Sequence, residues 1–167
     1  FCSNTDPESL GKVKLMKLFY FLDFGHVKKY AAPITFDSYV NLPHGPIPST
    51  IKNLVDDVCD DPDSSLLSDV ISCEISEGKM IQKIIPKRKF NEEDEKLFSK
   101  TELEMLENIC TRFGDKTARF VESVSHAEAP WRTTSTLQDI PYKLAILDRD
   151  CLVSEEEIDF VTNVYSN

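Results

Sequence analysis

The chain has 167 residues, of which 41% are hydrophobic and 29% are charged, and its formal net charge is -10. These values exclude a disordered chain and leave room for a buried core, so we expect one α+β domain over residues 1–167, mostly helical, with a small antiparallel β-hairpin or sheet. Phosphate backbones repel so acidic a chain, which disfavours direct nucleic-acid binding and suits a basic protein partner. Solubility alone also explains acidity, and charge by itself favours that explanation.

Cysteine usage indicates the compartment. The five cysteines are odd in number, widely spaced and without a Cys-x-x-Cys pair, so we expect reduced thiols in a cytoplasmic protein and neither a disulfide framework nor a zinc site. No apolar run approaches the roughly 20 residues of a membrane helix, and no signal peptide is recognised. The chain begins at Phe1 and not at Met, which leaves open a segment upstream.

A long apolar helix dominates the first part of the chain. Asp6–Glu8 carries an acid, a proline and a second acid, the pattern of a helix start. The helix is expected to end near Tyr30, because Pro33 follows and the residue before a proline avoids helical angles. Apolar residues cover more than one face, which predicts a central helix. Three lysines predict an exposed basic strip, explained by solvation or by partner binding: Lys12, Lys14 and Lys17.

An extended, proline-rich segment follows. Ile34–Leu42 alternates loosely and predicts a short strand or an extended loop. Pro43–Pro48 contains three prolines and one glycine, which restrict the backbone at little entropic cost on folding. Such a stiff loop is suited to docking a partner, or it is simply a tight connection. Apolar residues with helical spacing then predict a short helix that starts near Pro48 and reaches Val58.

The middle of the chain combines acidic and β-forming stretches. Asp56–Asp63 is acidic but supplies neither the glycine nor the closing glutamate of an EF-hand loop, so no metal is expected there. Residues 70–75 and 80–85, joined by a turn at 76–79, predict a β-hairpin.

Helices return in the last third. Thr101–Glu104 and Ser154–Glu157 both fit the capping-box pattern at a helix start. Asp115 is expected to cap a helix that ends before Pro130, and Asp139 to cap a short helix that runs to Leu147. About six helices are therefore expected in all.

Catalytic signatures are missing. The three histidines, His26, His44 and His126, have no cysteine partner in a recognisable nucleophile motif, and the chain lacks Walker A, G-x-G-x-x-G and H-E-x-x-H patterns. We therefore expect no enzyme, no cofactor and no metal, with a Cys/His-dependent hydrolase as the weaker alternative.

An ordered set of short motifs carries a family resemblance. The motifs are Lys14–Leu18 with Tyr20 and Asp23, Tyr30 with Pro33–Thr35 and Tyr39, Gly45–Ser49, Ser125-His126 with Pro130-Trp131, and Ile140–Tyr142. In this order the chain resembles, from Leu10 to Leu147, the SocA-like antitoxins with a Panacea domain. It departs from them at Pro43-His44, where relatives often show an aromatic residue before the glycine.

The resemblance implies an antitoxin of a bacterial or phage type II toxin–antitoxin system, which neutralises a cognate toxin by direct protein–protein binding. It leaves open a proteolytic adaptor that delivers a toxin to a protease, and a homo-oligomer. Trp131 is a core residue or an interface hot spot, since both environments favour tryptophan. The candidate contact residues are Tyr30, Tyr39, His44, Pro46, Pro48 and Trp131.

Overall fold

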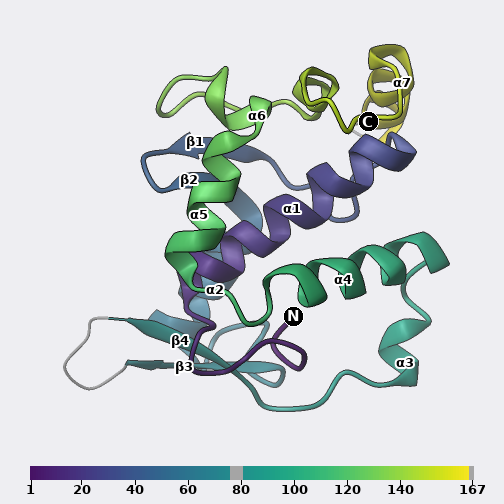
Figure 1. Ribbon diagram of the computed structural model, residues 1–167. Helices are drawn as coiled ribbons and strands as arrows, with labels where there is room; N and C mark the ends of the chain where they lie inside the picture. The colour runs from purple at the N-terminus through teal and green to yellow at the C-terminus, as the bar shows by residue number, and fades with distance from the viewer. Residues whose placement is uncertain (76–80, 166–167) are drawn as a thin grey trace.

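The structure is a computed structural model that describes residues 1–75 and 81–165 (Figure 1). These residues form seven α-helices, one 3-10 helix and two antiparallel two-stranded sheets, which confirms the mostly helical α+β class. The six expected helices are present, and two single-turn helices, α3 and α6, were not expected. The elements are α1 (Lys12–Tyr30), β1 (Tyr39–Leu42), β2 (Gly45–Pro48), α2 (Ser49–Asp60), β3 (Ile71–Ile75), β4 (Gln82–Pro86), α3 (Glu92–Glu95), α4 (Lys100–Phe113), α5 (Ala118–Ala127), α6 (Ala129–Arg132), the 3-10 helix η1 (Tyr142–Leu147) and α7 (Glu155–Tyr165).

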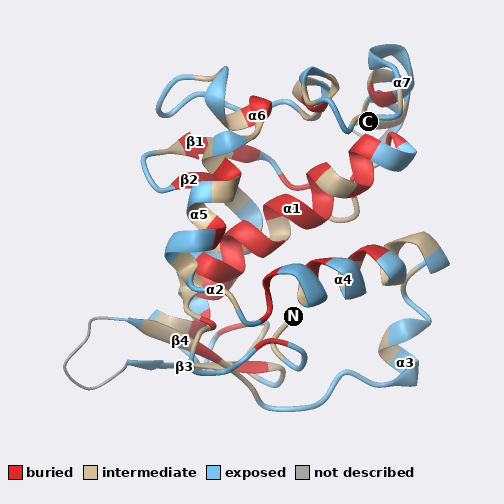
Figure 2. Ribbon diagram, in the orientation of Figure 1, coloured by how far each residue is buried: buried red, intermediate tan, exposed pale blue. Residues whose placement is uncertain are grey.

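Helix α1 runs through the centre of the molecule, as its apolar residues predict. It packs against α4, α5, η1 and β2, and Figure 2 shows burial along most of its length. The expected start at Asp6–Glu8 is wrong, because the helix begins at Lys12 with Gly11 as its N-cap. The backbone before Lys12 pairs with strand β4 instead of forming helix. The carbonyl of Leu10 accepts a hydrogen bond from the amide of Ile84, and Gly11 forms a β-bridge with Lys83.

The expected basic strip on α1 is also wrong. Lys14 and Lys17 are fully buried, because the elements that pack around α1 cover the faces on which these two lysines lie. Lys14 Nζ donates to the carbonyl oxygen of Gly114 at 2.9 Å, and Lys17 Nζ donates to the carbonyl oxygen of Pro46 at 2.8 Å. Only Lys12 remains partly exposed, in an ion pair with Asp56.

The proline-rich segment forms a β-hairpin of β1 and β2. Tyr39 pairs with Pro48 and Leu42 with Gly45. Residues 137–140 cover the edge of β1 that does not pair with β2. The amide of Leu137 donates to the carbonyl oxygen of Asn41 at 2.7 Å, and the amide of Ile140 donates to the carbonyl oxygen of Tyr39 at 2.8 Å. The hairpin therefore sits between α1 on one side and an extended segment on the other.

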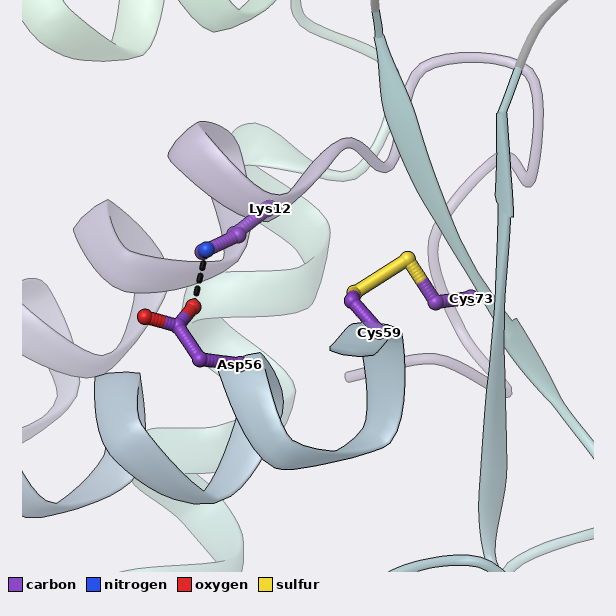
Figure 3. Close-up of a disulfide and its surroundings, with 4 residues drawn as sticks. All are labelled: Lys12, Asp56, Cys59 and Cys73. Atoms are coloured by element: carbon purple, nitrogen blue, oxygen red, sulfur yellow. Dashed lines mark ion pairs between the residues drawn. A yellow bond between two sulfur atoms is a disulfide. The ribbon is translucent and has the colours of Figure 1, made fainter. Parts of the chain in front are cut away.

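The predicted hairpin is confirmed as β3 and β4, which pair antiparallel, while its turn at 76–79 lies outside the described residues. The expectation of reduced thiols is wrong for two cysteines: Cys59 of α2 and Cys73 of β3 form a disulfide (Figure 3). The spacing of the cysteines could not indicate this bond, because it depends on the packing of α2 against β3. The thiols of Cys2, Cys110 and Cys151 are free.

Helix caps differ from their predictions by a few residues. The capping box of α4 is formed by Ser99 and Glu102, because the hydroxyl of Thr101 lies within the helix, 3.1 Å from Nε2 of His26. Helix α5 is capped by Thr117 and not by Asp115. In contrast, Ser154 and Glu157 make the reciprocal hydrogen bonds that their spacing predicts.

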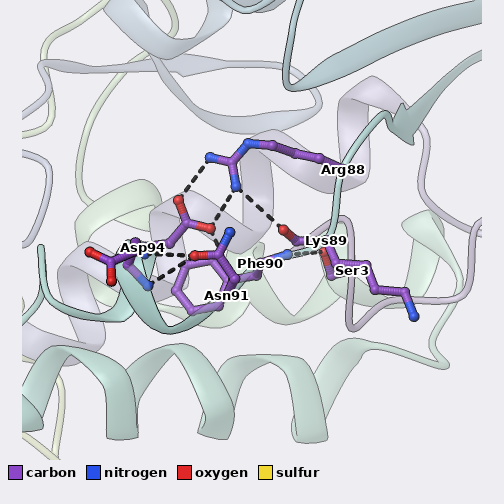
Figure 4. A network of polar contacts seen from close by, with 7 residues as sticks. Ser3, Arg88, Lys89, Phe90, Asn91 and Asp94 are labelled. Carbon is purple, nitrogen blue, oxygen red and sulfur yellow. Dashed lines mark hydrogen bonds and ion pairs between the residues drawn. The ribbon is translucent and has the colours of Figure 1, made fainter.

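The start of helix α3 was not predicted, and the start of η1 was predicted at the wrong residue. Asn91 caps the short helix α3 in a capping box with Asp94, whose carboxylate also receives two hydrogen bonds from Arg88 (Figure 4). Asp139 does not cap the short helix near Leu147; η1 begins after Pro141, and Asp139 instead forms a β-bridge with Val40.

Candidate partner-binding surface

A buried carboxylate, Asp23 on α1, organises the proline-rich region. Its oxygens accept hydrogen bonds from the amides of Ile34 and Thr35 at 2.9 and 2.8 Å, and from the hydroxyls of Tyr39 and Tyr142 at 2.9 and 3.2 Å. A buried charge is costly unless it is hydrogen-bonded, and these donors satisfy it. Burial raises the pKa of the Asp23 carboxyl, while the hydrogen bonds from Thr35, Tyr39 and Ile34 lower it. Asp23 thereby ties the segment 34–39 and the distant Tyr142 to α1.

A second carboxylate, Asp37, fixes the far end of the hairpin. Its oxygens accept hydrogen bonds from the amides of Thr50 and Ile51 at 2.9 and 2.8 Å, the first turn of α2. An acid at a helix N-terminus satisfies amides that lack a partner within the helix. Sequence reasoning missed this cap, because Asp37 lies 13 residues before Thr50 and not at the helix start.

Lys17 of α1 contacts the hairpin at Pro46, whose carbonyl oxygen accepts a hydrogen bond from its ammonium group. Burial lowers the pKa of Lys17 to about 7, although the negative charge of Glu122 raises it in part. Gly45 directly overlies this lysine with φ of 97°; a Cβ there would lie 2.8 Å from both Cε of Lys17 and Oγ of Ser125. Only glycine fits a site that combines a left-handed backbone with such close contacts.

The side of the hairpin is held by Trp131. Its Nε1 donates to the carbonyl of Leu42 at 3.1 Å, and its ring stacks on His126 with centroids 3.8 Å apart. The buried side chain of Asn41 donates to the carbonyl oxygen of Trp131 at 2.8 Å. Trp131 is partly buried, so one ring both supports the hairpin and remains in contact with solvent.

Apart from Trp131, which is partly buried, the structure places the sequence-predicted contact residues either inside the hairpin or at two exposed positions. Tyr39, Pro46 and Pro48 are buried in the hairpin and hold its shape, so their side chains do not form the outer surface. His44 is exposed at the hairpin turn, with Nδ1 3.3 Å from Oε1 of Glu122. Tyr30 lies exposed at the C-terminal end of α1, where it packs on His26, away from the hairpin.

Sequence reasoning missed Leu137. Its side chain is 75% exposed and its φ is 68°, a left-handed conformation that is unfavourable for a residue with a Cβ. It lies beside the hairpin, since its amide donates to Asn41. A single leucine within the polar stretch Thr133–Asp139 is the signal that would have singled it out.

We call five exposed or partly buried residues of this region the hairpin surface. They come from the β1–β2 turn, α5, α6 and the segment that pairs with β1. The hairpin surface consists of His44, Glu122, His126, Trp131 and Leu137.

Within residues 1–75 and 81–165, no three His, Cys, Asp or Glu side chains are grouped as a metal site requires. None of the helices in these two ranges combines the length and the apolar character that crossing a bilayer demands. Burial raises the pKa of the Cys2 and Cys110 thiols, which disfavours their reactive thiolate forms.

Comparison with known proteins gives one match. A family model described as "Antitoxin SocA-like, Panacea domain" matches residues 15–132. The matched range includes Asp23, the β1–β2 hairpin and Trp131, whereas Leu137 and Tyr142 lie beyond it. No curated protein and no solved structure matches the chain.

Proposed function

The chain belongs to the SocA-like antitoxin family with a Panacea domain, and from this membership we propose that it is the antitoxin of a type II toxin–antitoxin system. It binds a cognate protein toxin in the cytoplasm through the hairpin surface and covers the toxin's working surface. The observation that carries this assignment is Trp131, a partly exposed tryptophan that two hydrogen bonds join to the hairpin and whose ring stacks on His126 of α5.

Rigidity supports this role. Binding costs less when the contact residues are already ordered, because little side-chain and loop entropy is lost. The hairpin is held from below by Lys17, at its side by Trp131 and at its ends by Asp23 and Asp37. Tryptophan is also among the residues that dominate binding energy at protein interfaces.

Charge supports a basic toxin. The chain carries a formal net charge of -10, and complementary charge speeds association and rejects like-charged partners. Binding to a basic toxin is therefore expected to weaken as salt is added, mainly through a slower association rate.

The proposal assigns no catalytic step to this chain. Neutralisation by coverage requires only an interface, and the raised thiol pKa values of Cys2 and Cys110 support a non-catalytic role, since a thiol is a poor nucleophile. A thiol-reactivity scan checks this point, because a catalytic cysteine reacts much faster than a buried structural one.

The test is co-expression of the chain with the products of neighbouring genes. We expect one product to be toxic alone, to be neutralised by this chain and to co-purify with it. Leu137→Asp should weaken neutralisation, whereas Leu97→Asp, a matched change at a side chain 81% exposed between α3 and α4, should not. The proposal is refuted if no neighbouring product is toxic or if none binds. Neutralisation that requires a host protease would identify an adaptor instead.

A further inference from the structure

The sheet of β3 and β4 has two edges that differ in how they are covered. On the β4 side, the amide of Ile84 donates to the carbonyl oxygen of Leu10 at 3.0 Å, and Pro86 has no amide to leave unpaired. On the β3 side, no strand or β-bridge pairs with Ile71–Ile75 in the part of the chain that the structure describes. An uncovered strand edge is a template for pairing with another chain.

The hydrogen-bond pattern shows which backbone groups of β3 point outward. Residue pairs in an antiparallel ladder alternate between hydrogen-bonded and non-hydrogen-bonded. The amide of Lys87 donates to the carbonyl oxygen of Val70 at 2.8 Å, so this pair is a hydrogen-bonded one. Three pairs further along, Cys73 and Ile84 therefore form a non-hydrogen-bonded pair. The amide of Ile84 does point away from β3, as its bond on the other edge requires.

Alternate residues of β3 thus direct their backbone groups away from β4, namely Ile71, Cys73 and Ile75. The amide of Ile71 donates to the carbonyl oxygen of Leu67 at 3.0 Å. The amides of Cys73 and Ile75, and the carbonyls of all three outward residues, make no hydrogen bond with another described residue. The side chain of Ile75 is 73% exposed, so these open groups lie beside an exposed apolar side chain.

Helix α2 covers a face of this sheet and not the outer edge of β3. Strand side chains stand roughly perpendicular to their sheet, so the disulfide from Cys73 to Cys59 places α2 above or below the strand (Figure 3). The backbone groups of the edge point sideways, within the plane of the sheet. The next strand of a longer sheet would lie in that direction.

The sequence of β3, Ile-Ser-Cys-Glu-Ile, suits antiparallel pairing with itself. A two-fold axis at Cys73 places Ile75 opposite Ile71 of a second copy, and Ser72 opposite its Glu74. Apolar residues then face each other, and no like charges are opposed. An axis at Glu74 would oppose two carboxylates, and an axis at Ser72 would need the amide of Ile71, which is already engaged.

We propose that β3 pairs edge to edge with β3 of a second copy of this chain, which joins the two sheets into one antiparallel sheet across a two-fold axis at Cys73. The amide of Cys73 in each copy donates to the carbonyl of Cys73 in the other, and the amide of Ile75 donates to the carbonyl of Ile71. Each open amide thereby finds an acceptor. Such a two-fold contact is closed and does not extend into a fibre. It does not rest on the proposed function, because it involves no residue of the hairpin surface.

The first experiment is sedimentation of the purified chain from about 10 μM to about 1 mM, the range in which a weak dimer dissociates. We expect the average mass to rise reversibly with concentration. Added salt should raise it further, because two chains of formal net charge -10 repel each other and salt screens this repulsion. A chain that stays monomeric throughout overturns the proposal.

A proline variant tests the edge itself. Ile75→Pro should abolish the dimer with little change in melting temperature, because it removes an amide that points away from β4. Ile75→Val, which keeps the amide and an apolar side chain, is the matched control and should retain the dimer. An Ile75→Pro variant that dimerises like the original chain overturns the proposal. So does a monomeric original chain whose toxin binding is lost in Ile75→Pro, since the edge would then receive a strand of the toxin.

Charge variants test the register without interrupting the strand. Ser72→Lys should tighten the dimer about fivefold, because it places a cation opposite Glu74 of the second copy, and Ser72→Glu should weaken it about fivefold. Ser123→Lys and Ser123→Glu, at an exposed position on α5, make the same charge changes away from β3 and should not differ in this way. Equal dimer constants for the two Ser72 variants overturn the proposal.

NMR gives the direct check of the contact. Ser72 and Glu74 of opposite copies form a non-hydrogen-bonded pair of the new ladder, in which the two Hα atoms face each other. A dimeric sample mixed from isotope-labelled and unlabelled chain should therefore show a nuclear Overhauser effect between Hα of Ser72 in one copy and Hα of Glu74 in the other. A dimer without this signal is held by another surface, and the proposal fails.

Discussion

The hydroxyl of Tyr142 donates a hydrogen bond of 3.2 Å to Oδ2 of Asp23, a residue 119 positions earlier in the chain. The same hydroxyl lies 2.7 Å from the carbonyl oxygen of Asp37, so its single proton is shared between these two acceptors. One phenol thus connects the segment beyond the matched family range to α1 and to the base of the hairpin. The fold around the hairpin depends on this buried polar cluster as well as on apolar packing.

Replacing Asp23 by Asn should destabilise the fold by about 3–5 kcal/mol, because an amide cannot accept from all the donors that surround the carboxylate. Tyr142→Phe should cost about 1–2 kcal/mol, since it removes one donor and leaves the ring in place. Tyr30→Phe, at an exposed residue, is the control. Urea denaturation measures each free energy of unfolding, and a loss below about 1 kcal/mol for Asp23→Asn would contradict the role assigned to this carboxylate.

Lys17 should make stability rise with pH. Its folded pKa is lowered to about 7, so above pH 7 the folded state has lost a proton that the unfolded chain keeps until about pH 10. Unfolding then takes up a proton, and the free energy of unfolding should gain up to about 1.4 kcal/mol per pH unit in this range. Lys17→Met should remove that slope, and Lys116→Met, at a side chain that is 42% exposed, should keep it. Identical slopes for the original chain and Lys17→Met would refute the prediction.

Gly45→Ala should destabilise the chain by about 2–4 kcal/mol. The new methyl group would meet Lys17 and Ser125 at 2.8 Å, and the left-handed backbone adds about 1–2 kcal/mol of its own. Gly11→Ala is the matched control, because its methyl group would find its nearest neighbour at 3.4 Å, an ordinary contact. Thermal melts of the two variants should separate them clearly, and equal melting temperatures would argue against the close approach at Gly45.

The disulfide between Cys59 and Cys73 should contribute about 3 kcal/mol, because it closes a loop with a sequence separation of 14. Reduction should lower the Tm by about 6–12 °C in a chain of this size. The double variant Cys59→Ser/Cys73→Ser should be insensitive to reductant, whereas Cys110→Ser should respond like the original chain. Peptide mapping without reductant provides the direct check, and separate Cys59 and Cys73 peptides would disprove the bond.

Leu137→Gly should separate binding from folding. Glycine tolerates the φ of 68° without the penalty that leucine incurs, so stability should change by no more than about 1 kcal/mol. The exposed apolar side chain is nevertheless lost, and toxin neutralisation should weaken. Growth rescue and thermal melts of the same variant test this pair of outcomes; full rescue would remove Leu137 from the hairpin surface.

Local patterns identified much of the fold in advance. The apolar residues of α1 indicated a central helix, because a helix that is apolar on more than one face must be packed on two or more sides. The reciprocal pair of Ser154 and Glu157 lies within one helical turn, so its spacing alone determined the start of α7. At the start of α4, Ser99 and Thr101 lie two residues apart, and the predicted capping box at Thr101 was therefore two residues away from the observed one at Ser99.

The candidate site was identified less completely. The motifs singled out Trp131 and His44, but also Tyr39 and Pro46, which the structure places inside the hairpin. Leu137 was missed because its position follows from a backbone hydrogen bond to Asn41, far away in the sequence. Asp37 was missed for the same reason, since the helix that it caps begins beyond the hairpin.

By itself, the sequence determined the mostly helical composition, the β3–β4 hairpin, the central helix and the family to which the chain belongs. Only the tertiary structure decided that Lys14 and Lys17 are buried, that Cys59 and Cys73 are bonded, and that one carboxylate gathers three segments. The physical reason is the range of the forces involved. Helix periodicity and capping act between neighbours in the chain, whereas burial, ion pairing and disulfide formation depend on which distant segments pack together.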